Sequence, residues 1–115
     1  MHPVKQWRVE YTHEIEHALS ARNAGNEGMA RVSARRAAGI IIREYLSRKG
    51  LTSQNNSAYK RLSVFISLPD VDNYYQDIAN HFLLKVETDH TFPEDIDLIN
   101  DAQWLAENLL LENPS

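Results

Sequence analysis

The segment from Met29 to Leu46 constrains the fold more than any other part of this chain. Wound as a helix at about 100° per residue, its small and apolar residues cover more than half of the circumference. They are Ala30, Val32, Ala34, Ala37, Ala38, Gly39, Ile41, Ile42, Tyr45 and Leu46. A helix with so broad an apolar arc must be contacted on several sides. The segment therefore predicts the central helix of an all-α protein.

Turn and capping residues divide the rest of the chain into further helical segments. Gly25 and Gly50 suit the left-handed ends of two helices, and Asn26 is a good N-cap for the second of them. Ser67-Leu-Pro-Asp70 and Thr91-Phe-Pro-Glu94 resemble capping boxes at the start of two later helices. We predict helices over residues 5–24, 26–49, 57–67, 70–87 and 93–111. No stretch shows the alternation of a half-buried strand, so the expected fold is an antiparallel four- to five-helix up-and-down bundle.

Each of the outer helices is expected to bury one stripe of side chains spaced three and four residues apart. In the first helix the stripe is Trp7, Tyr11, Ile15, Ala18 and Leu19. In the fourth it is Val71, Tyr75, Ile78 and Phe82, and in the fifth it is Leu98, Ile99, Ala102, Leu105, Ala106 and Leu109.

Composition bounds the class of protein and its compartment. A chain of 115 residues fits one domain, residues 1–115, with one hydrophobic core. The absence of cysteine excludes disulfides and thiolate metal sites. No apolar run approaches the ~20 residues needed to cross a bilayer, and residues 1–5 lack the apolar stretch of a secretion signal. We therefore expect a cytoplasmic protein that does not enter a membrane.

Charge is distributed unevenly along the chain. Eleven of the twelve Lys and Arg residues precede Asp70, whereas eleven of the sixteen Asp and Glu residues lie from Asp70 onward. The favoured interpretation is that the two halves neutralise each other inside the bundle. The alternative is an exposed dipolar surface that attracts an anionic partner or a second copy of the chain.

The first helix contains the H-E-x-x-H motif of zinc proteases, from His13 to His17. In such an enzyme the two histidines would bind zinc and Glu14 would act as the general base. Here Glu16 places a charge inside the motif, and the histidines fall on the face opposite the predicted apolar stripe. We expect a solvated face that binds zinc or nickel adventitiously at most, and no cofactor. A metal-dependent hydrolase is the third functional hypothesis.

Arg31 and Arg35 lie inside the apolar arc of the predicted central helix. A half-buried arginine needs a partner, and the acids of the fifth helix could supply one. Structural pairing is favoured over ligand binding for both arginines, because ion-pair networks often mimic sites. The candidate ligand-binding residues are nevertheless Arg31, Arg35 and His81, should the protein act on RNA or nucleotides.

The sequence also gives indications for and against several other functions. No phosphate-binding P-loop and no nucleophile elbow are present. The basic residues of the central helix spread around its axis, and the isoelectric point is about 5.7, which argues against nucleic-acid binding. Trp104 and Leu111 lie on the polar side of the fifth helix, and exposed apolar pairs of this kind favour an interface. The alternative is that Trp104 packs under the N-terminal segment.

Residues 25–46, GNEGMARVSARRAAGIIIREYL, resemble the second helix of HEPN domains. The order of two long helices, a short one and two more is also similar to that family, as is the acidic turn before Ile99 and the closing helix. The resemblance implies a helical bundle that usually dimerises, often beside a nucleotidyltransferase partner protein. It also implies ribonuclease activity in members with an R-x4-6-H motif near the fourth helix. His81 is present in this chain, but no Arg follows Arg61.

The leading hypothesis is therefore a non-catalytic, HEPN-like helical module that homodimerises and binds a partner protein or small ligand. The runner-up is an RNA- or nucleotide-acting HEPN-type protein, such as a ribonuclease or a toxin–antitoxin component.

Overall fold

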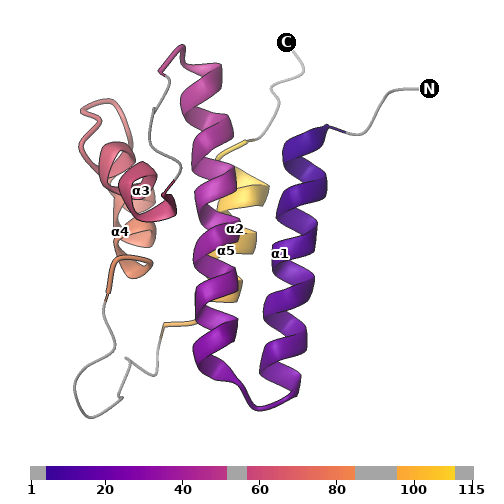
Figure 1. Cartoon of the computed structure of the whole chain (residues 1–115). Helices are drawn as coiled ribbons and strands as arrows, with labels where there is room; N and C mark the ends of the chain where they lie inside the picture. Colours follow the sequence, from indigo (N-terminus) through magenta and orange to yellow (C-terminus); the bar gives the residue numbers. More distant parts are fainter. Residues whose placement is uncertain (1–4, 52–56, 85–95, 111–115) are drawn as a thin grey trace.

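Helix α2 lies at the centre of the computed structural model, as the sequence predicts (Figure 1). The structure describes residues 5–51, 57–84 and 96–110. Its helices are α1 (Gln6–Asn23), α2 (Glu27–Arg48), α3 (Ala58–Ile66), α4 (Asn73–His81) and α5 (Leu98–Asn108). Over the described ranges every regular element is a helix. The expected all-α class is confirmed.

Three other helices contact α2 on different sides. α1 runs beside it along most of its length, α3 crosses it on the opposite side, and α5 lies behind it in Figure 1. Helix α4 packs against α3 and α5 rather than extensively against α2. The residues of α2 that meet these neighbours are fully buried, among them Ala30, Ala34, Ala37, Ala38, Ile41 and Ile42. Small side chains at most of these positions allow the neighbouring helices to approach closely.

The turn between α1 and α2 has the predicted chemistry. Gly25 adopts a φ of 79°, the left-handed region that glycine occupies without steric cost. The side chain of Asn26 accepts a hydrogen bond from the backbone N–H of Met29 at 3.1 Å, as expected of an N-cap. No helix in the described ranges is both long and apolar enough to cross a membrane.

Two predicted helix starts are wrong. Helix α4 begins at Asn73, where Asp72 caps the N–H of Tyr74 at 2.9 Å. The hydroxyl of Ser67 instead donates to the carbonyl of Val64 at 2.6 Å, at the end of α3. Several hydroxyl and carboxylate side chains compete for the free amides of a helix start, and here the later carboxylate is the cap. Helix α4 also ends at His81, before the predicted residue 87.

Helix α5 begins at Leu98, later than the predicted residue 93. Asp97 is its N-cap and accepts from the N–H groups of Ile99 and Asn100. Residues 91–94, the predicted capping box, lie outside the described residues. The prediction for Leu19 is wrong too, because this side chain is 41% exposed. Helix α1 packs mainly against α2, so only a narrow stripe of α1 is buried.

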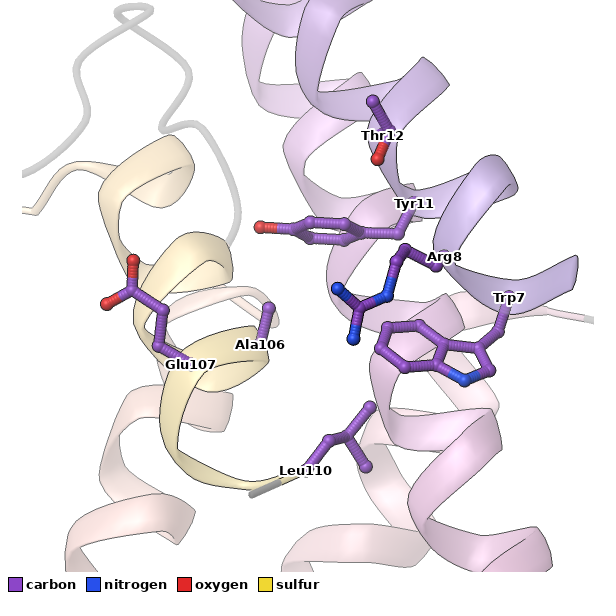
Figure 2. Close-up of a pocket in the computed structure, with 7 residues that line it drawn as sticks. All are labelled: Trp7, Arg8, Tyr11, Thr12, Ala106, Glu107 and Leu110. Carbon is purple, nitrogen blue, oxygen red and sulfur yellow. The ribbon is translucent and has the colours of Figure 1, made fainter. Parts of the chain in front are cut away.

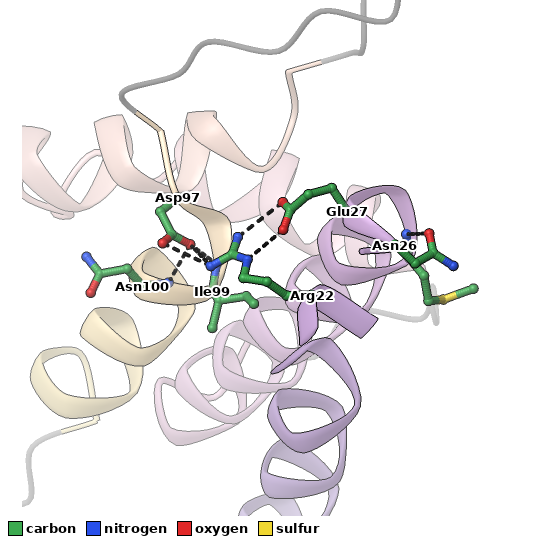
Figure 3. Close-up of polar contacts among 7 residues, drawn as sticks. Arg22, Asn26, Glu27, Asp97, Ile99 and Asn100 are labelled. Carbon is green, nitrogen blue, oxygen red and sulfur yellow. Dashed lines mark hydrogen bonds and ion pairs between the residues drawn. The ribbon is translucent and has the colours of Figure 1, made fainter. Parts of the chain in front are cut away.

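Arg22, near the end of α1, binds residues at the start of α2 and at the start of α5 (Figure 3). Its Nε lies 2.6 Å from Oε1 of Glu27, in the first turn of α2. Its Nη1 lies 3.1 Å from both carboxylate oxygens of Asp97, the cap of α5. The Arg22 guanidinium holds the pKa of Glu27 below its usual value, chiefly through this hydrogen bond. The end of α1, the start of α2 and the start of α5 therefore meet at one ion-pair network.

Replacing Asp97 by alanine is expected to lower the free energy of unfolding by about 1–2 kcal/mol. An N-cap contributes about 1 kcal/mol, and an exposed ion pair such as that with Arg22 adds up to about 1 kcal/mol. Asp97→Asn is the matched control, because asparagine caps equally well but carries no charge. Urea unfolding should show a smaller loss for Asp97→Asn than for Asp97→Ala. Equal losses would mean that the cap contributes nothing.

Candidate functional site

A pocket of about 500 Å³ lies between α1, α2 and the start of α3. We name it the arginine pocket, after the charges that line it. Val32, Arg36 and Ile40, spaced four residues apart on one face of α2, form its floor. The walls include Glu14 of α1, together with Arg35 of α2 and Ala58, Tyr59 and Arg61 of α3. Three guanidinium groups thus share one pocket with a single carboxylate.

Arg61 is the most unusual residue of the pocket. Only 8% of it is exposed, and its buried Nε has no hydrogen-bond partner among the residues that the structure describes. Burial lowers the pKa of Arg61, with a smaller effect from the neighbouring Arg43 and an opposing one from Glu10. A buried charge is costly unless it is paired and hydrogen-bonded. The pocket is therefore lined by a cation that is largely removed from water.

Glu14, on the α1 wall of the pocket, also has a buried polar atom without a partner among the described residues. Its Oε2 is buried and accepts no hydrogen bond from the described part of the chain. One turn earlier on α1, Glu10 pairs with Arg43 of α2. Within the described residues, Glu14 forms no such ion pair with Arg61 or with any other cation. Two residues that line the same pocket, Glu14 and Arg61, therefore each contain a buried polar atom without a partner among the described residues.

Among the described residues, the partner of Arg35 is a backbone carbonyl and not an acid of the fifth helix. The Nε of Arg35 donates to the backbone carbonyl of Phe82 at 2.6 Å, just beyond the end of α4. Burial lowers the pKa of Arg35, and the charge of Arg31 adds to the effect. The carbonyls at a helix C-terminus carry the negative end of its dipole. Arg35 thus supports α4 on one side and lines the pocket on the other.

The start of α3 adds further positive potential. Ala58 and Tyr59, its first two residues, line the pocket. The N-terminus of a helix carries a partial positive charge and free N–H groups. Arg36, on the floor, is exposed. The pocket therefore attracts anions, although the chain as a whole has a net charge of −4.

His81, the third candidate ligand-binding residue, is not among the residues that line the pocket. Its Nδ1 lies 2.8 Å from Oδ2 of Asp101 on α5. Only 8% of Asp101 is exposed, and burial raises its pKa, against the opposing effect of the bond to His81. Because Arg35 binds the carbonyl of the next residue, Phe82, the structure brings Arg35 and His81 to the same end of α4. Arg31 lies one turn before Arg35 on α2 and is half-buried.

The predicted interface residue Trp104 packs against α4. Its ring centroid lies 5.0 Å from that of Tyr74 and 5.2 Å from that of Tyr75. Trp104 is half-buried, whereas Tyr74 is 58% exposed. Leu111, the second predicted interface residue, lies outside the described residues.

The zinc-motif histidines are exposed on α1, as expected. The Nδ1 of His17 lies 2.9 Å from the hydroxyl of the buried Ser33. In the described part of the chain, no group of three His, Asp or Glu side chains could hold a metal ion. Glu14, the would-be general base, lines the arginine pocket instead.

A second groove, of about 520 Å³, separates α1 from the end of α5 (Figure 2). The ring of Tyr11 extends from α1 toward α5, and Glu107 lies across the groove. Burial raises the pKa of Tyr11 to about 12, with a smaller contribution from the charge of Glu107.

A spectrophotometric titration is expected to show one tyrosine that ionises only near pH 12. The phenol of an unfolded chain has a pKa of about 10, so folding favours the neutral form of Tyr11. This stabilisation is complete below about pH 10 and is lost as the pH rises through about 12. The variant Tyr11→Phe should lack this late step, and Glu107→Gln should move it to lower pH. A late step that persists in Tyr11→Phe would assign it to another tyrosine.

Comparisons with models of known protein families, with curated proteins and with solved structures give no match. The function is therefore inferred from the geometry of the site.

Sequence reasoning missed Arg61, although a signal existed. Ala58, Arg61 and Phe65 are spaced three and four residues apart on α3, and Leu62 lies beside them. This spacing places the arginine on the apolar stripe of the helix. What the sequence could not show is that the stripe meets Glu14 and Arg36 across a pocket, because these residues come from three different helices.

Proposed function

We propose that this chain is a non-catalytic, HEPN-like helical module that binds an anionic group of a partner protein or small ligand in the arginine pocket. The observation that carries the proposal is the pocket that Arg35, Arg36 and the largely buried Arg61 line, in which the Arg61 side chain forms no ion pair with another described residue. Guanidinium groups match the oxygens of phosphate and carboxylate. An anion would give these groups acceptors and neutralise the excess positive charge.

Calorimetry with inorganic phosphate as the probe tests this proposal. Wild-type protein should bind phosphate, and Arg36→Gln and Arg61→Gln should each weaken the affinity about tenfold or more. The reason is that a hydrogen bond to a charged group contributes about 1.5–3 kcal/mol. Lys60→Gln is the matched control, because Lys60 is exposed, adjacent to Arg61 and outside the pocket lining. Equal phosphate affinity in all four proteins would contradict the proposal.

The family proposal rests on the order and lengths of the helices. Two long helices of 18 and 22 residues precede α3 and α4, each of 9 residues, and α5, of 11 residues. The helical hairpin of α1 and α2 supports an antiparallel up-and-down arrangement (Figure 1). An adjacent reading frame that encodes a nucleotidyltransferase would support the paired arrangement that the resemblance implies.

We also propose that the module homodimerises through the surface around Tyr74 and Trp104. The support is the exposed ring of Tyr74 stacked edge-on against Trp104, since aromatic side chains are enriched at interfaces. Light scattering should give a dimer for the wild type and a monomer for Tyr74→Asp. Val9→Asp, at an exposed apolar position on α1, should remain dimeric. A wild-type monomer at high concentration would contradict this proposal.

The pairing of His81 with Asp101 favours a second candidate function, chemistry on RNA or nucleotides. A buried carboxylate that accepts from Nδ1 of a histidine orients the ring and leaves Nε2 available for proton transfer. Arg35 lies at the same end of α4 and could contact a phosphate. A ribonuclease assay decides between the two functions. If wild-type protein cleaves RNA and both His81→Ala and Arg35→Ala abolish the cleavage, the catalytic function replaces the non-catalytic one. If wild-type protein does not cleave RNA, the result supports the non-catalytic proposal.

A further inference from the structure

The anion-binding proposal leaves one side chain of the arginine pocket unexplained. Glu14 lines the pocket without an ion-pair partner among the described residues, and an ionised carboxylate can only accept hydrogen bonds. A simple anion would satisfy Arg61, but it would bring a second negative charge into the pocket that Glu14 lines. The ligand must therefore also supply a donor that faces Glu14.

We propose that the arginine pocket binds an aminoalkyl phosphate, with its phosphate on Arg36 and Arg61 and its ammonium group on Glu14. The inference rests on the proposed function. Three guanidinium groups against one carboxylate leave an excess of two positive charges, which suits the dianionic head of a phosphate monoester better than a carboxylate. The pocket volume of about 500 Å³ lies within the range of small-molecule sites.

The ligand matches both kinds of charge that line the pocket. Phosphate oxygens can accept from the guanidinium groups of Arg36 and Arg61, and an ammonium group can donate to the carboxylate of Glu14. Charge-assisted hydrogen bonds of this kind are stronger than neutral ones, and more so in a desolvated site. The start of α3, at Ala58 and Tyr59, adds N–H groups and a favourable dipole for the phosphate.

Two matched probes test the role of Glu14. 2-Aminoethyl phosphate and ethyl phosphate carry the same head and differ in the ammonium group. Calorimetry on wild-type protein should show about tenfold tighter binding of the aminoethyl compound. Glu14→Gln should remove this advantage, while its affinity for ethyl phosphate stays the same or rises because a like charge is gone. Glu16→Gln, at an exposed position on the same helix, should retain the wild-type preference.

The outcomes separate this inference from the proposed function. If neither compound binds, both proposals fail. If the two compounds bind the wild type equally, the pocket is an anion site and the role of Glu14 is refuted. Thermal unfolding of each variant shows whether it is folded, and Glu14→Ala replaces Glu14→Gln if the latter is not. Phosphatidylethanolamine carries a phosphate diester with a single negative charge, so binding to vesicles of this lipid that is as tight as binding to 2-aminoethyl phosphate would contradict the assignment of a phosphate monoester.

Discussion

Replacing Phe82 by alanine is expected to lower the free energy of unfolding by about 3–5 kcal/mol. Phe82 is fully buried and directly follows α4 as its C-cap. Its backbone carbonyl accepts the hydrogen bond from Arg35 of α2. The ring therefore anchors the end of α4 in the core while the carbonyl meets the central helix. Truncation to alanine leaves a cavity that the surrounding helices can fill only in part.

Urea unfolding followed by circular dichroism measures this effect. The total stability of a domain of this size is typically about 5–15 kcal/mol. Phe82→Ala should therefore lower the urea concentration at the unfolding midpoint by a large fraction of its wild-type value. Leu84→Ala is the matched control two residues later, because Leu84 is 38% exposed. We expect the control to lose less than about 1 kcal/mol. A similarly small loss for Phe82→Ala would show that α4 is not docked through this ring.

Replacing Gly39 by alanine is expected to destabilise the protein by about 1–3 kcal/mol, although alanine is the better helix former. A Cβ at position 39 would lie 2.6 Å from Cβ of Ala58 and 3.0 Å from its Cα. The second of these atoms belongs to the backbone, so it cannot turn aside. Helix α3 would have to move away from α2, and the wall of the arginine pocket would move with it.

Gly28→Ala is the matched control for this prediction. Gly28 lies in the first turn of the same helix, and the nearest atom to an added Cβ is 3.8 Å away. Here the helix propensity of alanine should stabilise the protein by up to about 1 kcal/mol. The double variant Gly39→Ala, Ala58→Gly should recover part of the loss, because it removes the closest contact. If Gly39→Ala and Gly28→Ala were equally stabilising, α3 would not pack on α2 as described.

Local physical chemistry made the central helix predictable. The broad apolar arc of α2, the left-handed Gly25 and the cap formed by Asn26 all depend on residues within a turn or two of one another. The start of α4 is harder to predict from the sequence, because Ser67 and Asp72 are both good N-cap residues and lie within a few residues of each other. The sequence alone offers no reason to prefer one, since the choice depends on where α4 packs against α3 and α5.

The arginine pocket shows the limit of sequence reasoning more clearly. In the sequence, Glu14 belongs to a zinc-protease motif, acids of the fifth helix are possible partners of Arg35, and Arg61 has no predicted role. In the structure, all three residues line one pocket, and the partner of Arg35 is a backbone carbonyl. Partners separated by tens of residues are chosen by packing, which periodicity along one helix does not contain.

The sequence by itself determined that the chain folds into helices and that the segment from Met29 to Leu46 lies among them, because backbone geometry repeats every few residues and apolar side chains must leave water. Only the tertiary structure decided which charges are deprived of water and of partners. Desolvation depends on neighbours from several helices at once, so the unmet atoms of Arg61 and Glu14 become visible only when α1, α2 and α3 are brought together.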